Sequence, residues 1–235
     1  AEAPPTQAEP AMPVPRESGH HSTQTKQTSQ LPASSGFIGR VKGVLISPER
    51  EWEAVAAEKP DVNGIMLKYV LILSLIPAVA SFIYTALIGE TVFGYRIRST
   101  SGGIVQAIIQ IVSALASVYL IALVTAWLAT QYDGIKNKGR ALQLIAYAMT
   151  PTWLAGFFHI LPSARTFKII AMTIGGIYAA VLIYKGLPLM MESPRENTFR
   201  YTIAILVAAL LMLLGIGFIL GLGAGFILGN TDVAY

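Results

Sequence analysis

Cysteine is absent from the 235-residue chain, which excludes disulfide bonds, a thiol nucleophile and zinc or iron–sulfur sites held by cysteine. Charged residues are also scarce, at 13% of the chain, whereas 54% of its residues are hydrophobic and the mean hydropathy is +0.58. Such a composition does not describe a soluble surface, so the sequence predicts an integral membrane protein. Acidic residues are missing from four long intervals, which lie between Asp61 and Glu90, Glu90 and Asp133, Asp133 and Glu192, and Glu196 and Asp232.

The sequence also lacks the motifs of common enzyme classes. It contains no Walker-type lysine loop, no His-Glu-x-x-His pair and no Gly-x-Ser-x-Gly elbow. The glycine-rich stretch 221–225 lies inside an apolar run, where a dinucleotide-binding turn cannot form. The adjacent pair His20 and His21 has no further metal ligands nearby. We therefore expect a protein that is not an enzyme and that holds no cofactor or metal, with an unusual intramembrane hydrolase as the remaining enzymatic alternative.

Titratable residues are almost missing from the apolar segments. Proton pumps and coupled transporters normally place acids, bases or histidines at membrane depth, and here only His159 comes close. His159 is interpreted either as a histidine at the membrane interface or as a ligand or proton carrier. The lack of acidic residues disfavours ion-coupled transport but leaves passive conduction of a neutral solute open.

The N-terminal residues differ in composition from the rest of the chain. Residues 1–35 hold six of the 13 prolines together with Ser, Thr, Gln and Glu. They contain too few aliphatic residues to bury an apolar core, so we expect a disordered tail. No basic region followed by an apolar one occurs there, which argues against a cleavable secretory signal in these residues.

Residues 36–60 have the pattern of a short amphipathic segment. Apolar residues recur at helical spacing, and Ser47 followed by Pro48 is typical of a helix start with Ser47 as N-cap. One interpretation is a helix that lies on the membrane surface, anchored by Trp52. The alternative, equally open, is a helix packed against the protein's own cytoplasmic loops. The residues expected at the interface are Phe37, Arg40, Lys42 and Trp52.

The remaining residues, 61–235, are predicted to form a membrane domain of five helices, because a bilayer core of about 30 Å needs roughly 20 apolar residues per crossing. We expect an all-α fold. The predicted spans are 66–88, 104–130, 141–161, 167–186 and 202–228.

Lysine and arginine are distributed unevenly around these spans. Once the basic residues far from the first span are set aside, nine lie on the side of the N-terminus and four on the other side. The positive-inside rule therefore predicts a cytoplasmic N-terminus and an external Tyr235. A bacterial inner membrane is the expected location.

Proline and glycine mark special positions within the spans. Pro77 and Pro151 each remove a backbone hydrogen bond and predict kinks. Such a kink either shapes a cavity or is a static bend that the neighbouring helices tolerate. In the last span, Gly217, Gly221, Gly225 and Gly229 are spaced four apart, so they share one helix face. This face predicts close packing, against a helix of the same chain or against a second subunit.

Three sequence stretches together resemble a known family. They are S-P-E-R-E-W at 47–52, A-Y-A-M-T-P-T-W-L-A-G at 146–156 and Y-K-G-L-P-L-M-M-E-S-P-R-E-N at 184–197. In order and placement they resemble the bacterial branch of the YIP family, polytopic membrane proteins named for eukaryotic members that interact with Ypt/Rab GTPases. The resemblance runs from about residue 37 to 228 and implies five membrane helices, a cytoplasmic N-terminus and no catalytic residues.

Together these observations predict a non-enzymatic membrane scaffold or membrane-organising protein. Its expected partners are the lipid bilayer and other membrane proteins or a second copy of itself, without nucleic acid. The alternative is a small passive channel or transporter for an unidentified solute, in which the bends at Pro77 and Pro151 would shape a cavity.

Overall fold

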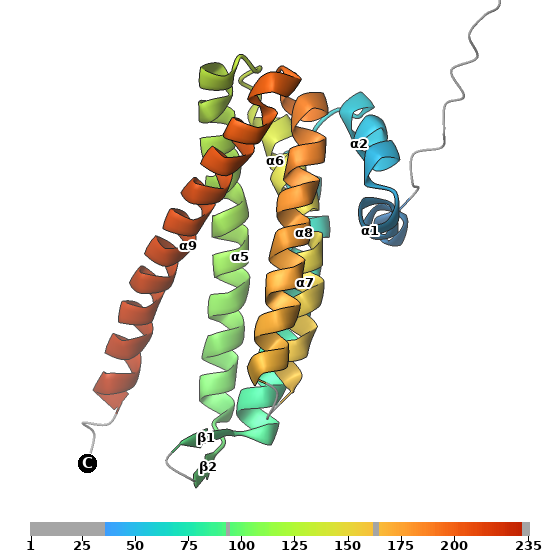
Figure 1. Cartoon of the computed structure of the whole chain (residues 1–235). Helices are drawn as coiled ribbons and strands as arrows, with labels where there is room; N and C mark the ends of the chain where they lie inside the picture. The colour runs from blue at the N-terminus through green and yellow to red at the C-terminus, as the bar shows by residue number, and fades with distance from the viewer. Residues whose placement is uncertain (1–35, 93–94, 162–164, 232–235) are drawn as a thin grey trace, which may run out of the picture. The chain divides into compact units, whose positions relative to one another are not determined.

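Long helices of apolar residues make up most of the described chain (Figure 1). The computed structural model describes residues 36–92, 95–161 and 165–231, so the tail predicted at 1–35 lies outside the described residues. The helical fold class predicted for a membrane protein is confirmed. Within the described residues, four helical runs are long and apolar enough to cross a membrane: Val62–Ile88, Thr100–Tyr132, Thr166–Met191 and Arg195–Ile219.

The first three runs contain the spans predicted at 66–88, 104–130 and 167–186, and the fourth covers the first part of the span predicted at 202–228. The first run is continuous but changes its winding, through α3 (Val62–Gly64), the π-helical turn η1 (Ile65–Val70), α4 (Leu71–Phe82) and a second π-helical turn, η2 (Ile83–Ile88). The second consists of α5 (Thr100–Leu128) and the 3₁₀ turn η3 (Ala129–Tyr132). The third and fourth are α8 (Arg165–Met191) and α9 (Arg195–Thr231).

The segment predicted as a span at 141–161 is helical but interrupted. It is divided into α6 (Lys138–Ala148), α7 (Thr150–Ala155) and the 3₁₀ turn η4 (Gly156–Ile160). The break falls beside Pro151, which cannot donate a backbone hydrogen bond to the carbonyl of Tyr147. The hydroxyl of Thr150 donates to that carbonyl instead, at 2.6 Å. A local side chain thus satisfies the backbone group that proline leaves unpaired, as a helix in a membrane requires.

A short hairpin, which the sequence analysis did not predict, connects the first two spans. Strands β1 (Glu90–Val92) and β2 (Tyr95–Ile97) pair antiparallel, with Glu90 opposite Ile97. Gly89 precedes the hairpin with φ of +87°, a backbone conformation that favours glycine. We call this end of the bundle the hairpin end.

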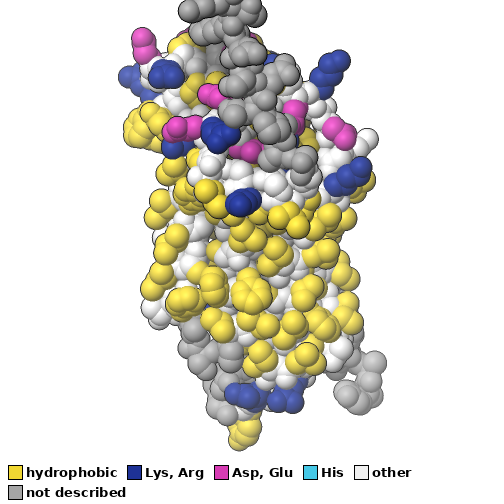
Figure 2. Space-filling view, turned by 90° about the vertical axis from the view of Figure 1, so that its right-hand side faces the viewer, with side chains coloured by type: hydrophobic (Ala, Val, Ile, Leu, Met, Phe, Trp, Pro, Cys, Tyr) yellow, Lys and Arg dark blue, Asp and Glu magenta, His cyan; other side chains and the backbone are white. Residues whose placement is uncertain are grey.

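The opposite end holds most of the buried core. Helices α1 (Phe37–Ile46) and α2 (Pro48–Ala57) pack there against α6, α7 and α8, and we call residues 36–58 the arm and this end the arm end. The largest fully buried side chains come from the arm, α6, α8 and α9, and include Trp52, Leu144, Leu187 and Tyr201. Figure 2 shows apolar side chains over the middle of one face, with charged side chains gathered near both ends.

Candidate functional site

The arm is fixed to the bundle by apolar side chains on its inner face. Val44, Trp52 and Val55 are each at most 1% exposed. Helix α2 begins at Pro48 as predicted, but the Ser47 side chain makes no capping hydrogen bond. The opposite face of α1 carries Ile38, Lys42 and Ile46, which are spaced four apart and exposed. The arm therefore has one face on the protein and one face turned away from it.

A buried ion cluster ties the two arm helices together. Arg40 of α1 donates from Nη1 to Oε1 of Glu51 in α2 at 2.7 Å, and its second terminal nitrogen donates to Glu58. The side chains of Arg40 and Glu51 are only 12% and 8% exposed. The Arg40 guanidinium also lies over the ring of Tyr147 in α6, 5.3 Å from its centroid, a distance typical of cation–π contact. The cluster thus joins α1, α2 and α6.

The charge of Arg40 is secured by these partners. Burial by itself lowers the pKa of the guanidinium, but the hydrogen bond to Glu58 and the charges of Glu58 and Glu51 outweigh burial and raise the pKa. Arg40 is therefore cationic at neutral pH, as arginine is in proteins generally. A second ion pair, more exposed, connects α2 to α8 where Lys185 donates to Glu49 at 2.9 Å, and this hydrogen bond lowers the pKa of Glu49.

Aromatic residues extend the junction into the first span. Phe37 meets Tyr69 edge to face at 5.5 Å between ring centroids, and Tyr69 meets Tyr147 in the same way at 4.8 Å. The hydroxyls of Tyr69 and Thr150 are hydrogen-bonded at 2.7 Å. The Thr150 hydroxyl also donates to the carbonyl of Tyr147, which Pro151 leaves without a backbone donor. The helix break beside Pro151 is therefore connected through Thr150 and Tyr69 to the contacts that hold the arm.

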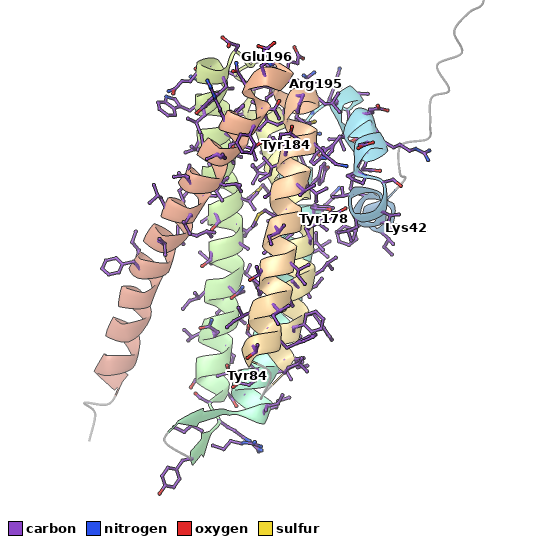
Figure 3. The ribbon with its side chains drawn as sticks, viewed as in Figure 1. Lys42, Tyr84, Tyr178, Tyr184, Arg195 and Glu196 are labelled. Atoms are coloured by element: carbon purple, nitrogen blue, oxygen red, sulfur yellow. The ribbon has the colours of Figure 1, made fainter. Side chains whose placement is uncertain are left out.

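Helix α8 also contacts the arm at two positions, Tyr178 and Gly186. Tyr178 donates to the carbonyl of Leu45 at 2.7 Å, a group in the last turn of α1 that has no helical partner. Figure 3 labels Tyr178 on α8 and Lys42 on the arm. The second contact is between Trp52 and Gly186. A Cβ added at Gly186 would be only 2.6 Å from Cε2 of the indole. Glycine is needed there because the indole occupies the place of a side chain.

Three of the four residues predicted at the interface contact other parts of the protein, which favours the alternative of a helix packed against the protein itself. Trp52 is buried in the protein instead of anchoring the arm in headgroups, Arg40 is held by glutamates, and Phe37 packs on Tyr69. Lys42 alone of the four predicted residues is exposed. The sequence contained one signal for this outcome. Glu51 and Val55 are four apart and share a face of α2, and a carboxylate on an apolar face indicates a buried cationic partner.

The two predicted kink prolines lie inside the bundle. Pro151 marks the break between α6 and α7, as predicted. Pro77 is buried within α4 and packs on Gly156, where an added Cβ would be 2.6 Å from the proline Cβ. Sequence reasoning did not identify Gly156 as a contact point. Pro77 therefore lies at a close contact between helices, and whether the two prolines act as static bends or shape a cavity stays a prediction.

The glycine face predicted in the last span is described only at Gly217. A Cβ at Gly217 would meet nothing within 4 Å, so packing against a helix of the same chain is not found at this position. The environments of Gly221, Gly225 and Gly229 lie outside the described residues. Packing of this face against a second chain stays a prediction.

His159 lies in η4 at the hairpin end, near Lys168 and Tyr84. Its Nδ1 is buried without a hydrogen-bond partner. Among the residues that the structure describes, no group of three or more His, Cys, Asp or Glu side chains could hold a metal ion.

Comparisons with known proteins agree with the resemblance found in the sequence. Residues 42–217 match the Yip1 domain. The inner membrane protein YohC of Escherichia coli strain K12 is 26% identical over 178 residues, which cover 75% of this chain and 91% of YohC. YohC of Escherichia coli O6:H1 matches to the same extent. No solved structure matches the chain.

Proposed function

Because the chain belongs to the Yip1 domain family, and because its relative YohC is named an inner membrane protein, we propose that it is a multi-pass inner membrane protein that organises other membrane proteins by lateral helix packing, without catalysis. The observation that carries this proposal is the exposure of α9. Only 11% of the apolar window of Arg195–Ile219 is buried within the chain, against 33% of that in Val62–Ile88.

The second half of α9 separates from the bundle. Near the arm end, Tyr201 and Ile205 are buried, and Tyr201 donates to the carbonyl of Thr125 in α5. Toward its C-terminal end the helix diverges from α5 (Figure 1). Residues 213–215 and 217–219 are all exposed, and consecutive positions point to every side of a helix. This part of α9 therefore has few contacts with its own bundle and offers a largely exposed apolar surface for contacts within the membrane.

A photo-crosslinking amino acid at Leu214 should yield discrete crosslinked protein bands in native membranes, because a packed partner lies within reach of the probe for long periods. The matched control is the same probe at Ile108, an exposed apolar position on α5 that is 54% exposed, against 63% at Leu214. Mass spectrometry of the bands identifies the partner, whether a second copy or another protein. If both positions crosslink only to lipid, α9 is simply immersed in the bilayer and the scaffold proposal fails.

The proposal includes five membrane crossings. The amide of Ile135, just after α5, donates to the carbonyl of Met191 at the end of α8, so these two ends lie together. The start of α8 lies at the hairpin end, because Lys168 stands over the ring of Tyr84 at 4.7 Å. The intervening α6, α7 and η4 must connect the two ends, and their 23 residues, 138–160, extend about 34 Å as helix. This supports a fifth, interrupted span.

Five crossings with a cytoplasmic N-terminus place the hairpin outside and the arm inside. The exposed face of α1, with Lys42 between two isoleucines, suits the headgroup region of the inner leaflet.

Alkaline phosphatase fused after Tyr235 is expected to be active, since the enzyme needs the oxidising compartment outside the membrane. The same fusion placed after Lys136, in the loop between α5 and α6, should be inactive. Enzyme activity in intact cells, corrected for fusion abundance, is the measurement. An inactive C-terminal fusion combined with an active loop fusion would contradict the proposed orientation, and equal activity in both would contradict the odd number of crossings between them.

A further inference from the structure

The hairpin end of the bundle contains two cavities that share part of their lining, an outer one that is mainly polar and an inner one in which a few polar groups stand among apolar side chains. The outer cavity has a volume of about 530 Å³ and lies among η2, α5, η4 and α8, near the Tyr84 labelled in Figure 3. The inner cavity has a volume of about 130 Å³ and extends deeper among α4, α5, α7, η4, α8 and α9. Gln110 and His159 line both cavities. The two cavities therefore form one recess that narrows toward the interior.

Helix α5 supplies a polar stripe to this recess. Its members are Gln106, Gln110, Ser113 and Ser117. Their spacing of four, three and four places them along one face of an otherwise apolar helix. Gln106 lies in the outer cavity and Ser117 in the inner one, so the stripe follows the recess from its wide part to its narrow part.

Three polar atoms at the inner cavity lack hydrogen-bond partners. They are Oγ of Ser117, Oγ1 of Thr152 and Nδ1 of His159, and all three are buried. The Ser117 residue is only 4% exposed. Buried polar groups in proteins are nearly always paired, with protein or with a bound molecule, and this demand is stronger within a membrane. Because the three atoms belong to α5, α7 and η4, one small occupant of the inner cavity can serve more than one of them.

The lining selects for an uncharged, hydrogen-bonding occupant. No acidic side chain of the described residues lines either cavity, so a cation finds no counter-charge from them. The ammonium of Lys168 lies in the outer cavity over the ring of Tyr84, and it is not part of the inner lining, so an anion finds no counter-charge there either. The rest of the inner lining is apolar, and its polar groups are hydroxyl, amide and imidazole, which both donate and accept hydrogen bonds.

We propose that this recess is a hydrated binding site for small neutral solutes that carry hydroxyl or amide groups, entered from the hairpin end. Water fills the inner cavity in the absence of solute and pairs Ser117, Thr152 and His159. This role is independent of the scaffold proposal, because it rests on the interior of the bundle and the scaffold proposal rests on the outer surface of α9.

The absence of native cysteine makes a direct test possible. Single cysteines replace Ser117 or Ser113 in the full-length protein, reconstituted into liposomes of Escherichia coli lipid. The probe is iodoacetamide, a small neutral amide that reacts with thiolate, a form present in water and not in hydrocarbon. Ile108→Cys is the lipid-facing control on the same helix, and Ser74→Cys is the control for a buried site, since Ser74 donates to the carbonyl of Leu71 and lines neither cavity.

We expect Ser117→Cys and Ser113→Cys to be modified at least about tenfold faster than both controls, as follows from the dependence of thiol reactivity on ionisation. Added acetamide should slow both reactions in a saturable manner, without affecting Thr100→Cys at the exposed start of α5. Thermal unfolding of each variant checks that its fold is retained, and either serine position alone suffices for the test.

Two results would overturn the proposal. If correctly folded Ser117→Cys and Ser113→Cys react as slowly as Ile108→Cys, the recess is dry. If they react quickly but acetamide has no effect, or slows Thr100→Cys equally, the recess holds water and does not bind neutral solutes. Neither result bears on the crosslinking test of α9, so the two proposals fail separately.

Discussion

Gly186→Ala is expected to destabilise the protein strongly, although alanine is the better helix former. The added Cβ would lie 2.6 Å from Cε2 of Trp52 and 2.7 Å from Cδ1 of Leu144, well inside ordinary van der Waals contact. Neither neighbour has room to move, because Trp52 is 1% exposed and Leu144 is completely buried. Overpacking of a filled core costs about 1–3 kcal/mol, which exceeds the gain of up to about 1 kcal/mol from replacing a helical glycine by alanine. The arm should loosen along with α8.

The matched control is Gly176→Ala in the same helix. A Cβ at Gly176 meets nothing within 4 Å, so only the gain in helix propensity remains and stability should be unchanged or raised. Thermal unfolding in detergent, followed by circular dichroism and by Trp fluorescence, measures both variants. If Gly186→Ala is as stable as Gly176→Ala, the indole of Trp52 does not pack against Gly186 as the structure describes.

Adjacent glycines in α8 illustrate what sequence could not predict. Gly175 and Gly176 are identical in sequence terms, yet a Cβ at Gly175 would be 3.0 Å from the carbonyl oxygen of Pro151, whereas Gly176 faces open space. Which of the two needs to be small depends on the face that α8 turns toward α7. That orientation is set by tertiary packing and leaves no mark on local composition.

The membrane helices could be predicted because their signal is local. Long apolar runs without acidic residues are sufficient to identify them. Three of the four apolar runs of the structure contain the corresponding predicted spans, and the fourth overlaps the span predicted at 202–228. The bend at Pro151 was also predictable, since proline removes a specific hydrogen bond. Its compensation by the Thr150 hydroxyl and the connection to Tyr69 required the structure, because Tyr69 is 81 residues away in the sequence.

The sequence predicts that the arm has an apolar face, but it does not predict which surface that face contacts. An amphipathic pattern shows that one face is apolar but does not say whether lipid or protein covers it, and Trp52 suits both environments. The apolar covering is provided by α6 and α8, which lie far along the chain. The buried position of Arg40 could not be inferred either, since its partners Glu51 and Glu58 are 11 and 18 residues away and meet it only when α1 and α2 fold against each other.

Arg40→Ala is expected to cost about 3–5 kcal/mol, the range for removing one partner of a buried ion pair. The variant leaves the side chain of Glu51, only 8% exposed, without the guanidinium that neutralises it, and it removes the cation from the ring of Tyr147. Because Arg40 joins α1 to both α2 and α6, the loss should be greatest in the arm. Amide hydrogen exchange in α1 and α2 should accelerate more than exchange in the membrane helices.

Two further variants separate burial from charge. Arg140→Ala breaks another arginine–glutamate pair, with Glu192, in which the side chains are 25% and 56% exposed, and such a surface pair contributes at most about 1 kcal/mol. Arg40→Lys keeps the charge but cannot present two terminal nitrogens to Glu51 and Glu58, so its stability should fall between the native protein and Arg40→Ala. Thermal unfolding and hydrogen exchange of all three variants measure how much the buried ion cluster stabilises the arm. If Arg40→Ala costs no more than Arg140→Ala, the ion cluster does not hold the arm, and the apolar contacts of Trp52, Val44 and Val55 do so without it.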